Sequence, residues 1–124
     1  MAKKILIVED DKFLRETLAK KFVTVALEVQ VAVDGKNALD ILKSITPDLV
    51  VLDLLLPDID GFGVLTEMKK DPKFKDTPVI VLSNLDKPDD MQKAKGLGAK
   101  DFMVKSNFTL NEIVGRVKST LGVA

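Results

Sequence analysis

The amino-acid sequence predicts an α/β fold in which a doubly wound, five-stranded parallel sheet carries helices on both faces. Short apolar runs alternate along the chain with longer segments whose apolar residues recur every three or four positions. The connections between these segments are short, as in right-handed crossovers between parallel strands. With 124 residues, of which 46% are hydrophobic, the chain can form one core and has little left for a second. We therefore expect residues 1–124 to form a single domain.

The composition excludes several classes of function. The chain has 19 basic and 19 acidic residues, interspersed along its length, so charge gives no reason to expect a nucleic-acid or membrane partner. It has neither an apolar run long enough to cross a membrane nor a signal peptide, and we expect a soluble, cytoplasmic protein. It contains no cysteine and no histidine, which excludes disulfides, thiolate catalysis and histidine bases. Any chemistry must use carboxylates, hydroxyls and lysines.

The first two predicted strands differ in pattern. Residues 5–8 form an apolar run, typical of a buried strand, that ends in three acids, of which Asp11 can cap the next helix. That helix has its apolar stripe at Leu14, Leu18, Phe22 and Val25. Residues 28–33 alternate between apolar and polar, as expected for a half-exposed edge strand.

The central strand follows a second helix, which begins at Asp34-Gly35 and ends before Pro47. The apolar stripe of this helix is Ala38, Ile41, Leu42 and Ile45. Residues 48–52 are an apolar run that leads into Asp53, and a proline and a glycine then close the segment. This pattern predicts a strand buried on both faces, with Asp53 at its carboxyl end.

The last part of the chain contains two more strands and three helices. Residues 62–70 form a helix, and residues 78–83 form a buried strand ending in Ser83. A short helix opens at Lys87-Pro88-Asp89 and closes at residues 96–99. Residues 101–105 predict a fifth strand ending in Lys105. The final helix is capped by Thr109 or Asn107 and has its stripe at Leu110, Ile113, Val114, Val117 and Leu121.

Four of the five strands end in residues that can carry chemistry. These residues are Glu9 and Asp10, Asp53, Ser83 and Lys105. Parallel strands place their carboxyl ends at one edge of the sheet, so these side chains meet if the first strand lies beside the third. Carboxylates about 5 Å apart repel by about 3 kcal/mol per pair at an effective dielectric constant near 20. Lys105 offsets only part of this charge, and an all-oxygen site favours Mg²⁺, or alternatively Mn²⁺.

This set of groups fits phosphoryl transfer to a carboxylate. An aspartate can attack a phosphoryl group and form an acyl phosphate. A divalent metal ion and Lys105 would neutralise the phosphoryl oxygens, and the hydroxyl of Ser83 would bind one of them. Asp53, at the end of the central strand, is the expected nucleophile.

The same residues resemble the receiver domain of two-component response regulators. The resemblance rests on the acidic pair after residues 5–8, Asp53 followed by Leu-Leu-Leu-Pro-Asp-Ile-Asp-Gly, Ser83, Gly98-Ala99 before Asp101-Phe102, and Lys105. It covers essentially the whole chain. It implies a flavodoxin-like (βα)5 fold with strand order 2-1-3-4-5. Since the sequence ends just after the fifth helix, we expect a stand-alone receiver domain without an output domain, and a piece of a longer regulator is the alternative.

The resemblance also implies roles for these residues. Asp53 would accept a phosphoryl group from a histidine kinase, a phosphotransfer protein or a small phosphodonor. The implied Mg²⁺ ligands are Glu9, Asp10, Asp53 and the backbone carbonyl of Leu55, with Glu9 acting directly or through water. Lys105 would contact the phosphoryl group. Ser83 and Phe102 would switch the surface of the fourth helix, fifth strand and fifth helix, which controls an unidentified output partner and could support a homodimer. The only catalysis would be phosphorylation and dephosphorylation of Asp53 itself.

Three positions depart from the family pattern. Ser106 stands where the family usually has a proline, often after a cis bond, Asn84 replaces a small residue, and Phe102 replaces a common tyrosine. A cis bond before serine would cost about 2.5 to 4 kcal/mol. These departures leave open a receiver-like interaction module that works without phosphorylation. An aspartate phosphatase or flavin carrier on the same fold is disfavoured, because the first strand lacks the required loop and the chain has no Trp or Tyr.

Simpler explanations also remain for single residues. Glu9 and Asp10 could cap a helix without binding metal, and Ser83 could make only a local side-chain turn. Lys105 could be an ordinary solvated lysine, and Phe102 could be an ordinary core residue.

Overall fold

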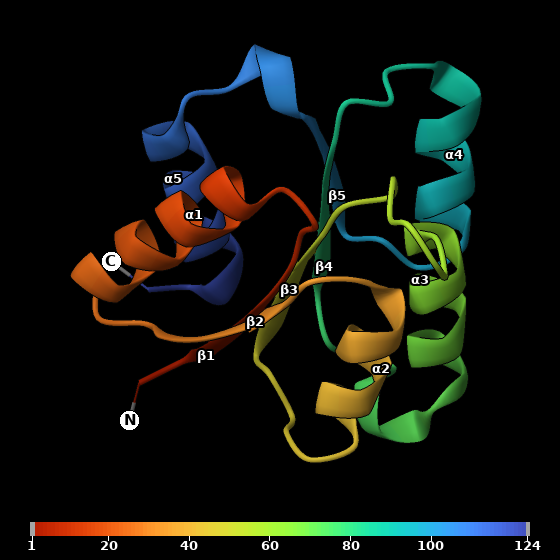
Figure 1. Cartoon of the computed structure of the whole chain (residues 1–124), viewed down its shortest axis with the longest axis horizontal. Helices are drawn as coiled ribbons and strands as arrows, with labels where there is room; N and C mark the ends of the chain where they lie inside the picture. The colour runs from red at the N-terminus through yellow and green to blue at the C-terminus, as the bar shows by residue number, and fades with distance from the viewer. Residues whose placement is uncertain (1, 124) are drawn as a thin grey trace.

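The chain forms one five-stranded parallel sheet with helices on both faces, as its computed structural model shows for residues 2–123 (Figure 1). The strand order is β2-β1-β3-β4-β5, as the family resemblance implied. The strands are β1 (Lys4–Val8), β2 (Glu28–Ala32), β3 (Leu49–Leu52), β4 (Val79–Ser83) and β5 (Asp101–Val104). Helices α1 (Lys12–Thr24) and α5 (Leu110–Leu121) cover one face, and α2 (Gly35–Leu42), α3 (Gly61–Lys70) and α4 (Pro88–Gly96) cover the other. Two 3₁₀ turns, η1 (Pro72–Phe74) and η2 (Lys105–Asn107), complete the described elements.

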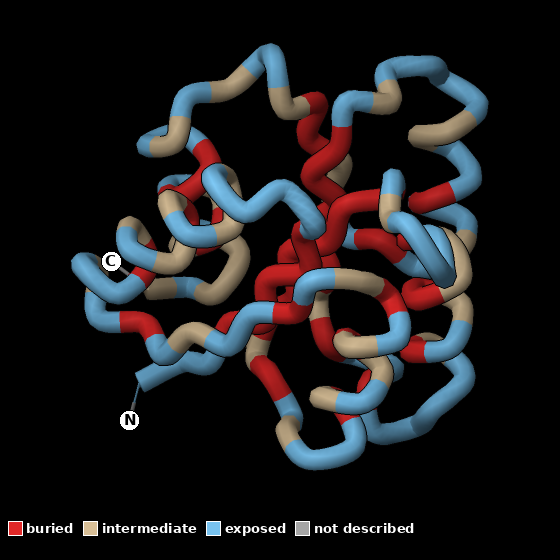
Figure 2. Tube along the Cα trace, viewed as in Figure 1, coloured by how far each residue is buried: buried red, intermediate tan, exposed pale blue. Residues whose placement is uncertain are grey.

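The three inner strands are buried on both faces, as their continuous apolar runs predict. Alternate side chains along them enter two separate cores. The core beneath α2, α3 and α4 takes Leu6, Val8, Val50, Leu52, Val79 and Val81 from these strands. The core beneath α1 and α5 takes Ile5, Ile7, Leu49, Val51, Ile80 and Leu82. In Figure 2 the buried residues accordingly gather in the middle of the molecule.

Capping residues set the start of several helices. The Asp11 carboxylate accepts hydrogen bonds from the N–H groups of Phe13 and Leu14 at the start of α1, as expected. Of the two caps considered for α5, the structure uses Thr109, which forms a capping box with Glu112.

The structure corrects three element boundaries. Val25, expected on the stripe of the first helix, lies after its end, because Ala26 adopts a left-handed φ of 65° that ends the helix. Ile45 lies beyond α2, whose end tightens into bonds from the N–H groups of Lys43 and Ser44 to carbonyls three residues earlier. Lys105 begins η2 and does not end β5, since the last pair of the β4–β5 ladder joins Ser83 and Val104.

The edge strand β2 is present as predicted, but its exposed residues are unexpected. Ala32 is fully buried, whereas Val31 and Val33 are 38% and 45% exposed. Both faces of β2 are thus only partly buried: Ala32 enters the core on the α2 side, where Gln30 is exposed, and Val29 packs against the core on the α1 side, where Val31 is exposed. Among residues 2–123, no helix has the length and apolar character needed to cross a membrane.

Candidate functional site

The residues predicted at the strand ends lie at one edge of the sheet. β1 pairs with β3, which is the condition on which their meeting depended. The sheet hydrogen bonding continues one residue past each strand: the Asp53 N–H bonds to the Val8 carbonyl at 3.0 Å, and the Glu9 N–H bonds to the Ala32 carbonyl at 3.1 Å. The backbones of Glu9 and Asp53 are therefore positioned by the sheet itself.

Three carboxylates and one ammonium group form the centre of this edge. Glu9, Asp10 and Asp53 each offer a carboxylate oxygen, and these oxygens lie within 4.8 Å of one another. The Lys105 Nζ lies 2.7 Å from Glu9 Oε1 and 2.9 Å from Asp53 Oδ2. Glu9 and Asp53 are buried, at 2% and 3% exposed, whereas Asp10 is exposed and marks the solvent side of the cluster.

The cluster carries more negative than positive charge. Burial, together with the charge of Asp53, raises the pKa of Glu9 to about 7, although the hydrogen bonds from Lys105 and from the Asp11 N–H oppose this. Burial alone would lower the pKa of Lys105, but its hydrogen bonds to Glu9 and Asp53 outweigh this and raise the pKa. One ammonium group facing three carboxylates leaves a deficit of positive charge. An all-oxygen donor set of this kind fits Mg²⁺ or Mn²⁺.

The loop after β3 holds the Asp53 side chain. Asp53 Oδ1 accepts a hydrogen bond from the Leu55 N–H at 3.1 Å, while Oδ2 faces Lys105. Leu55, the residue expected to offer a backbone carbonyl, is 53% exposed. Both oxygens of the expected nucleophile thus have fixed partners, one from the loop and one from the end of β5.

Ser83 ends β4 at the same edge, whereas Phe102 lies opposite Val81 within the ladder of β4 and β5. Within residues 2–123, neither makes a hydrogen bond to the carboxylates of the cluster. Ser83 is fully buried, and its hydroxyl oxygen accepts a long hydrogen bond of 3.4 Å from the Leu85 N–H. This is the local turn that the sequence left open as an alternative. Phe102 is partly buried and packs against the core beneath α2, α3 and α4. The structure therefore brings Glu9, Asp10, Asp53 and Lys105 together and leaves these two apart from them.

Two supporting residues escaped the sequence analysis. Arg15, in the second turn of α1, donates from its Nη1 to the backbone carbonyls of Glu9 at 2.9 Å and Asp10 at 3.3 Å. Asp58 accepts hydrogen bonds of 2.9 Å from the N–H groups of Gly35 and Lys36, which ties the loop after β3 to the start of α2. These backbone contacts lower the pKa of Asp58, even though desolvation opposes them. Asp58 stands within the motif that follows Asp53, but its contact with the start of α2 joins segments that only the fold brings together. Arg15 is only five and six residues from its partners, and no motif pointed to it.

The departure at Ser106 does not displace the lysine before it. All peptide bonds of the described residues are trans, including the one between Lys105 and Ser106. The Lys105 ammonium still reaches both buried carboxylates. The reading of Lys105 as an ordinary solvated lysine is therefore wrong.

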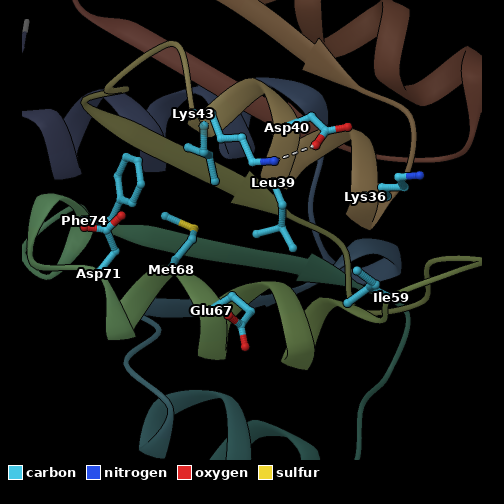
Figure 3. Close-up of a pocket in the computed structure, with 10 residues that line it drawn as sticks. Lys36, Leu39, Asp40, Lys43, Ile59, Glu67, Met68, Asp71 and Phe74 are labelled. Carbon is cyan, nitrogen blue, oxygen red and sulfur yellow. Dashed lines mark hydrogen bonds and ion pairs between the residues drawn. The ribbon is translucent and has the colours of Figure 1, made fainter.

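A separate groove lies between α2 and α3 (Figure 3). Its volume is about 390 Å³, and Leu39, Met68 and Phe74 contribute apolar side chains to it. Asp40 and Lys43 form an ion pair of 3.4 Å at its border. None of the strand-end residues lines this groove, so it is not part of the acidic cluster.

Comparison with known proteins shows which family this chain belongs to. The model of the response regulator receiver domain family matches residues 5–118. A probable transcriptional regulator, ycf27 of Porphyridium aerugineum, is 38% identical over 118 residues, which is 95% of this chain and 48% of that protein. The DNA-binding dual master transcriptional regulator RpaA of Synechocystis is 33% identical over 95% of this chain and 48% of its own length.

Two solved structures extend the comparison. The receiver domain of the Francisella response regulator 1452 has a TM-score of 0.88 and 31% identity, over 97% of both chains. The Mn²⁺-bound form of response regulator Rcp1 has a TM-score of 0.83 and 32% identity, over 94% of this chain and 92% of that chain. Fold and acidic edge together define a receiver-type α/β protein. The chain belongs to the response regulator receiver domain family. It spans about half the length of the curated relatives it matches.

Proposed function

We propose that this chain is a phosphorylation-controlled signalling domain whose phosphoacceptor is Asp53. The observation that carries the proposal is the placement of the Asp53 carboxylate between Lys105 and two further acids, at the carboxyl edge of the sheet. In open α/β sheets this edge is where ligands bind. Asp53 itself is nearly buried, but the exposed Asp10 and Leu55 border it, so a phosphodonor can approach from their side.

Mg²⁺ is the proposed metal, with Mn²⁺ as an alternative. Asp10, Asp53 and the backbone carbonyl of Leu55 would hold it, and Glu9 would bind it directly or through water. The excess of carboxylates over ammonium groups supports this assignment, as does the Mn²⁺-bound state of the related Rcp1. When bound, the metal ion supplies positive charge opposite the phosphoryl oxygens.

The transfer step uses an oxygen of Asp53 as the nucleophile. That oxygen forms a bond to phosphorus while the P–N bond of a phosphohistidine breaks. The electron pair stays on the imidazole nitrogen, which takes a proton from water. Lys105 is hydrogen-bonded to Asp53 Oδ2 before transfer, and its ammonium group can follow the negative charge onto the phosphoryl oxygens. The missing histidine in this chain fits a donor on another protein, such as a histidine kinase or phosphotransfer protein.

The output would pass through Ser83 and Phe102. The hydroxyl of Ser83 makes only a 3.4 Å contact with the Leu85 N–H, so little is lost when it turns to a phosphoryl oxygen. Phe102 would then move toward the vacated space and change the surface formed by α4, β5 and α5. We propose that this surface controls an output partner in the cytoplasm and that it can support a phosphorylation-dependent homodimer. The catalysis would be limited to phosphorylation and dephosphorylation of Asp53.

The names of the relatives bear on the question of which partners this chain has. Several carry the name of transcriptional regulators, and RpaA is named as DNA-binding, but this chain matches only about half of each. The expectation that the chain has no direct nucleic-acid partner therefore stays a prediction. A sensor kinase as donor remains the proposed partner.

The test is phosphorylation by acetyl phosphate with Mg²⁺, followed by intact-mass measurement. We expect the wild type to gain one phosphoryl group and Asp53→Asn to gain none, because an amide cannot form the acyl phosphate. Asp76→Asn is the matched control, since Asp76 is exposed in the loop before β4, at the opposite end of the sheet. A wild type that stays unmodified at saturating phosphodonor would contradict the proposal.

The second candidate is an interaction module that works without phosphorylation. Asn84 and Ser106 favour it, because both depart from the family pattern beside the expected phosphorylation site. A Mg²⁺ titration separates the two: a functional site should bind Mg²⁺ in a way that depends on Asp10 and Asp53. No such binding is expected of the second candidate.

A further inference from the structure

The free edge of β2 has features that the proposed function does not use. We propose that it is an interface through which two copies of this chain pair antiparallel, β2 against β2, so that the sheet continues across a two-fold axis. Figure 1 looks onto this edge: β2 crosses in front of β1 and β3, between α1 and α2. This surface is distinct from the α4-β5-α5 surface discussed above.

The backbone of β2 offers unpaired hydrogen-bonding groups at this edge. In a parallel ladder, alternate residues turn both their N–H and C=O groups to the same side. The Glu28 N–H and the Ala32 carbonyl bond to the β1 side, at Lys3 and Glu9, so Val29 and Val31 turn their groups outward. The Val33 N–H is already bonded to the Asn37 side chain at 2.9 Å. Within residues 2–123, the outward N–H and C=O groups of Val29 and Val31 have no partner.

An apolar strip lies beside this edge on the α1 side. Val29 and Val31 share one hollow with Ala19 and Val23, and Val31 shares the adjoining hollow with Val33. Val23 is 59% exposed, and Val31 and Val33 are also exposed. An added strand would cover part of this strip, because side chains of paired strands lie side by side on the same face.

The sequence of β2 complements itself in one antiparallel register. Centred on Gln30, Val29 of one copy lies opposite Val31 of the other, and the outward groups of both residues form four hydrogen bonds across the axis. In this register Glu28 faces Ala32 and Leu27 faces Val33, so no like charges lie opposite each other. Two copies thus satisfy the outward groups of Val29 and Val31 that one copy leaves unpaired.

Lysine, proline and a bulge, three common protections of an edge strand, are absent from this edge, and its one charged residue, Glu28, stands at the end of the strand. Natural edge strands carry lysine, proline or a bulge that prevents pairing. Residues 28–33 contain neither lysine nor proline, and β2 pairs with β1 in continuous register from Glu28 to Ala32. A second copy supplies the β-branched, extended segment that this edge fits. This is why we place a second copy there and not a helix or a nucleic acid.

The test is the mass of the full chain in solution, by sedimentation and light scattering from roughly 10 μM to 1 mM. We expect the average mass to rise from 13.6 kDa toward twice that value. Val31→Pro removes only the outward N–H, which proline tolerates on an edge strand. It deletes two of the four intermolecular bonds, so the dissociation constant should rise about ten-fold or more. Val31→Thr keeps the N–H and the branched side chain and should still dimerise.

A second variant and a second control guard against effects on folding. Val23→Lys places a charge in the apolar strip on α1, outside the strand, and should weaken the dimer as well. Phe13→Ser changes an apolar residue that is 79% exposed at the start of α1 and should leave the dimer unchanged. Asp53→Asn should dimerise like the wild type, because the β2 interface does not need phosphorylation. A wild type that stays monomeric to 1 mM, or a dimer that survives both Val31→Pro and Val23→Lys, would overturn the proposal.

Discussion

Glu9 is a buried residue whose proposed role in metal binding requires a charged carboxylate, and burial disfavours that charge. Its carboxyl group is 2% exposed, accepts a hydrogen bond from the Asp11 N–H at 3.1 Å and contacts Lys105 at 2.7 Å. Even with these partners, burial raises its pKa to about 7. The folded protein without metal therefore holds a proton on Glu9 more firmly than the unfolded chain does.

The raised pKa of Glu9 predicts how stability depends on pH. A group that binds its proton more tightly when folded stabilises the fold below its unfolded pKa, and this stabilisation is lost as pH rises through the folded pKa. Between pH 4.5 and about 7, the contribution of Glu9 to the free energy of unfolding should fall by about 3 kcal/mol. Urea unfolding of the metal-free protein at several pH values across this range measures the change in the free energy of unfolding.

Glu9→Gln is the matched variant for this prediction, because an amide keeps the shape and does not titrate. Relative to the wild type, the variant should become steadily more stable from pH 4.5 to 7, and the difference should then level off. If the free energies of unfolding of the two proteins changed with pH in parallel, the pKa of Glu9 would be the same in the folded and unfolded states, and the prediction would be wrong.

At the scale of elements, the loop after β3 depends on close backbone contact. A Cβ atom on Gly61 would lie 2.3 Å from the Asp53 carbonyl oxygen and 2.6 Å from the Leu54 Cα. The Gly61 N–H also bonds to the Leu54 carbonyl at 3.0 Å. The first residue of α3 is thus packed directly against the backbone of Asp53, the proposed phosphoacceptor.

Gly61→Ala should therefore damage both the fold and the site. We expect a loss of about 1 to 3 kcal/mol in the free energy of unfolding, since backbone and not a flexible side chain must move. Phosphorylation by acetyl phosphate should slow, because Asp53 shifts with the loop. Gly115→Ala is the control: Gly115 lies within α5 with nothing within 4 Å of its added Cβ, and alanine there should stabilise the helix by about 0.5 to 1 kcal/mol. Equal effects of the two substitutions would contradict this account.

At the scale of the whole molecule, the acidic cluster links strands that are far apart in sequence. Glu9 and Asp10 follow β1, Asp53 follows β3 and Lys105 follows β5. A metal ion bound there would therefore stabilise the assembled sheet and not the unfolded chain. Without metal, the repulsion between the carboxylates destabilises the assembled sheet.

Mg²⁺ should accordingly raise the thermal unfolding midpoint of the wild type. At a Mg²⁺ concentration about 100 times its dissociation constant, the gain is about 2.7 kcal/mol. Asp10→Asn should lose this gain yet be slightly more stable than the wild type without metal, because Asp10 is exposed and its charge repels Glu9 and Asp53. Calorimetry with Mg²⁺, and with NaCl at equal ionic strength, separates binding from screening. An Asp10→Asn variant that is stabilised as strongly as the wild type would place the metal elsewhere.

Much of the fold could be predicted from sequence because its signals are local. The continuous apolar runs of β1, β3 and β4 and the caps at Asp11 and Thr109 need no knowledge of neighbours. The predictions that placed Val25 and Ile45 inside helices were wrong. The left-handed residue Ala26 ends the first helix early, and a tightened last turn ends the second.

The sequence by itself determined the type and order of the elements, and that acids, a hydroxyl and a lysine stand at or just after the ends of the strands, because periodicity and the residues that follow a strand are properties of consecutive residues. Only the tertiary structure decided that Lys105 joins Glu9 to Asp53 while Ser83 turns to Leu85, and that Arg15 and Asp58 hold the loops around them. It also decided that β2 exposes its valines and buries Ala32. The contacts of Lys105 and Asp58 depend on distances between residues far apart in the chain, which strand pairing and helix packing set and a linear pattern does not contain. The contacts of Ser83 and Arg15 are local, but which rotamer each side chain adopts depends on the packing around it.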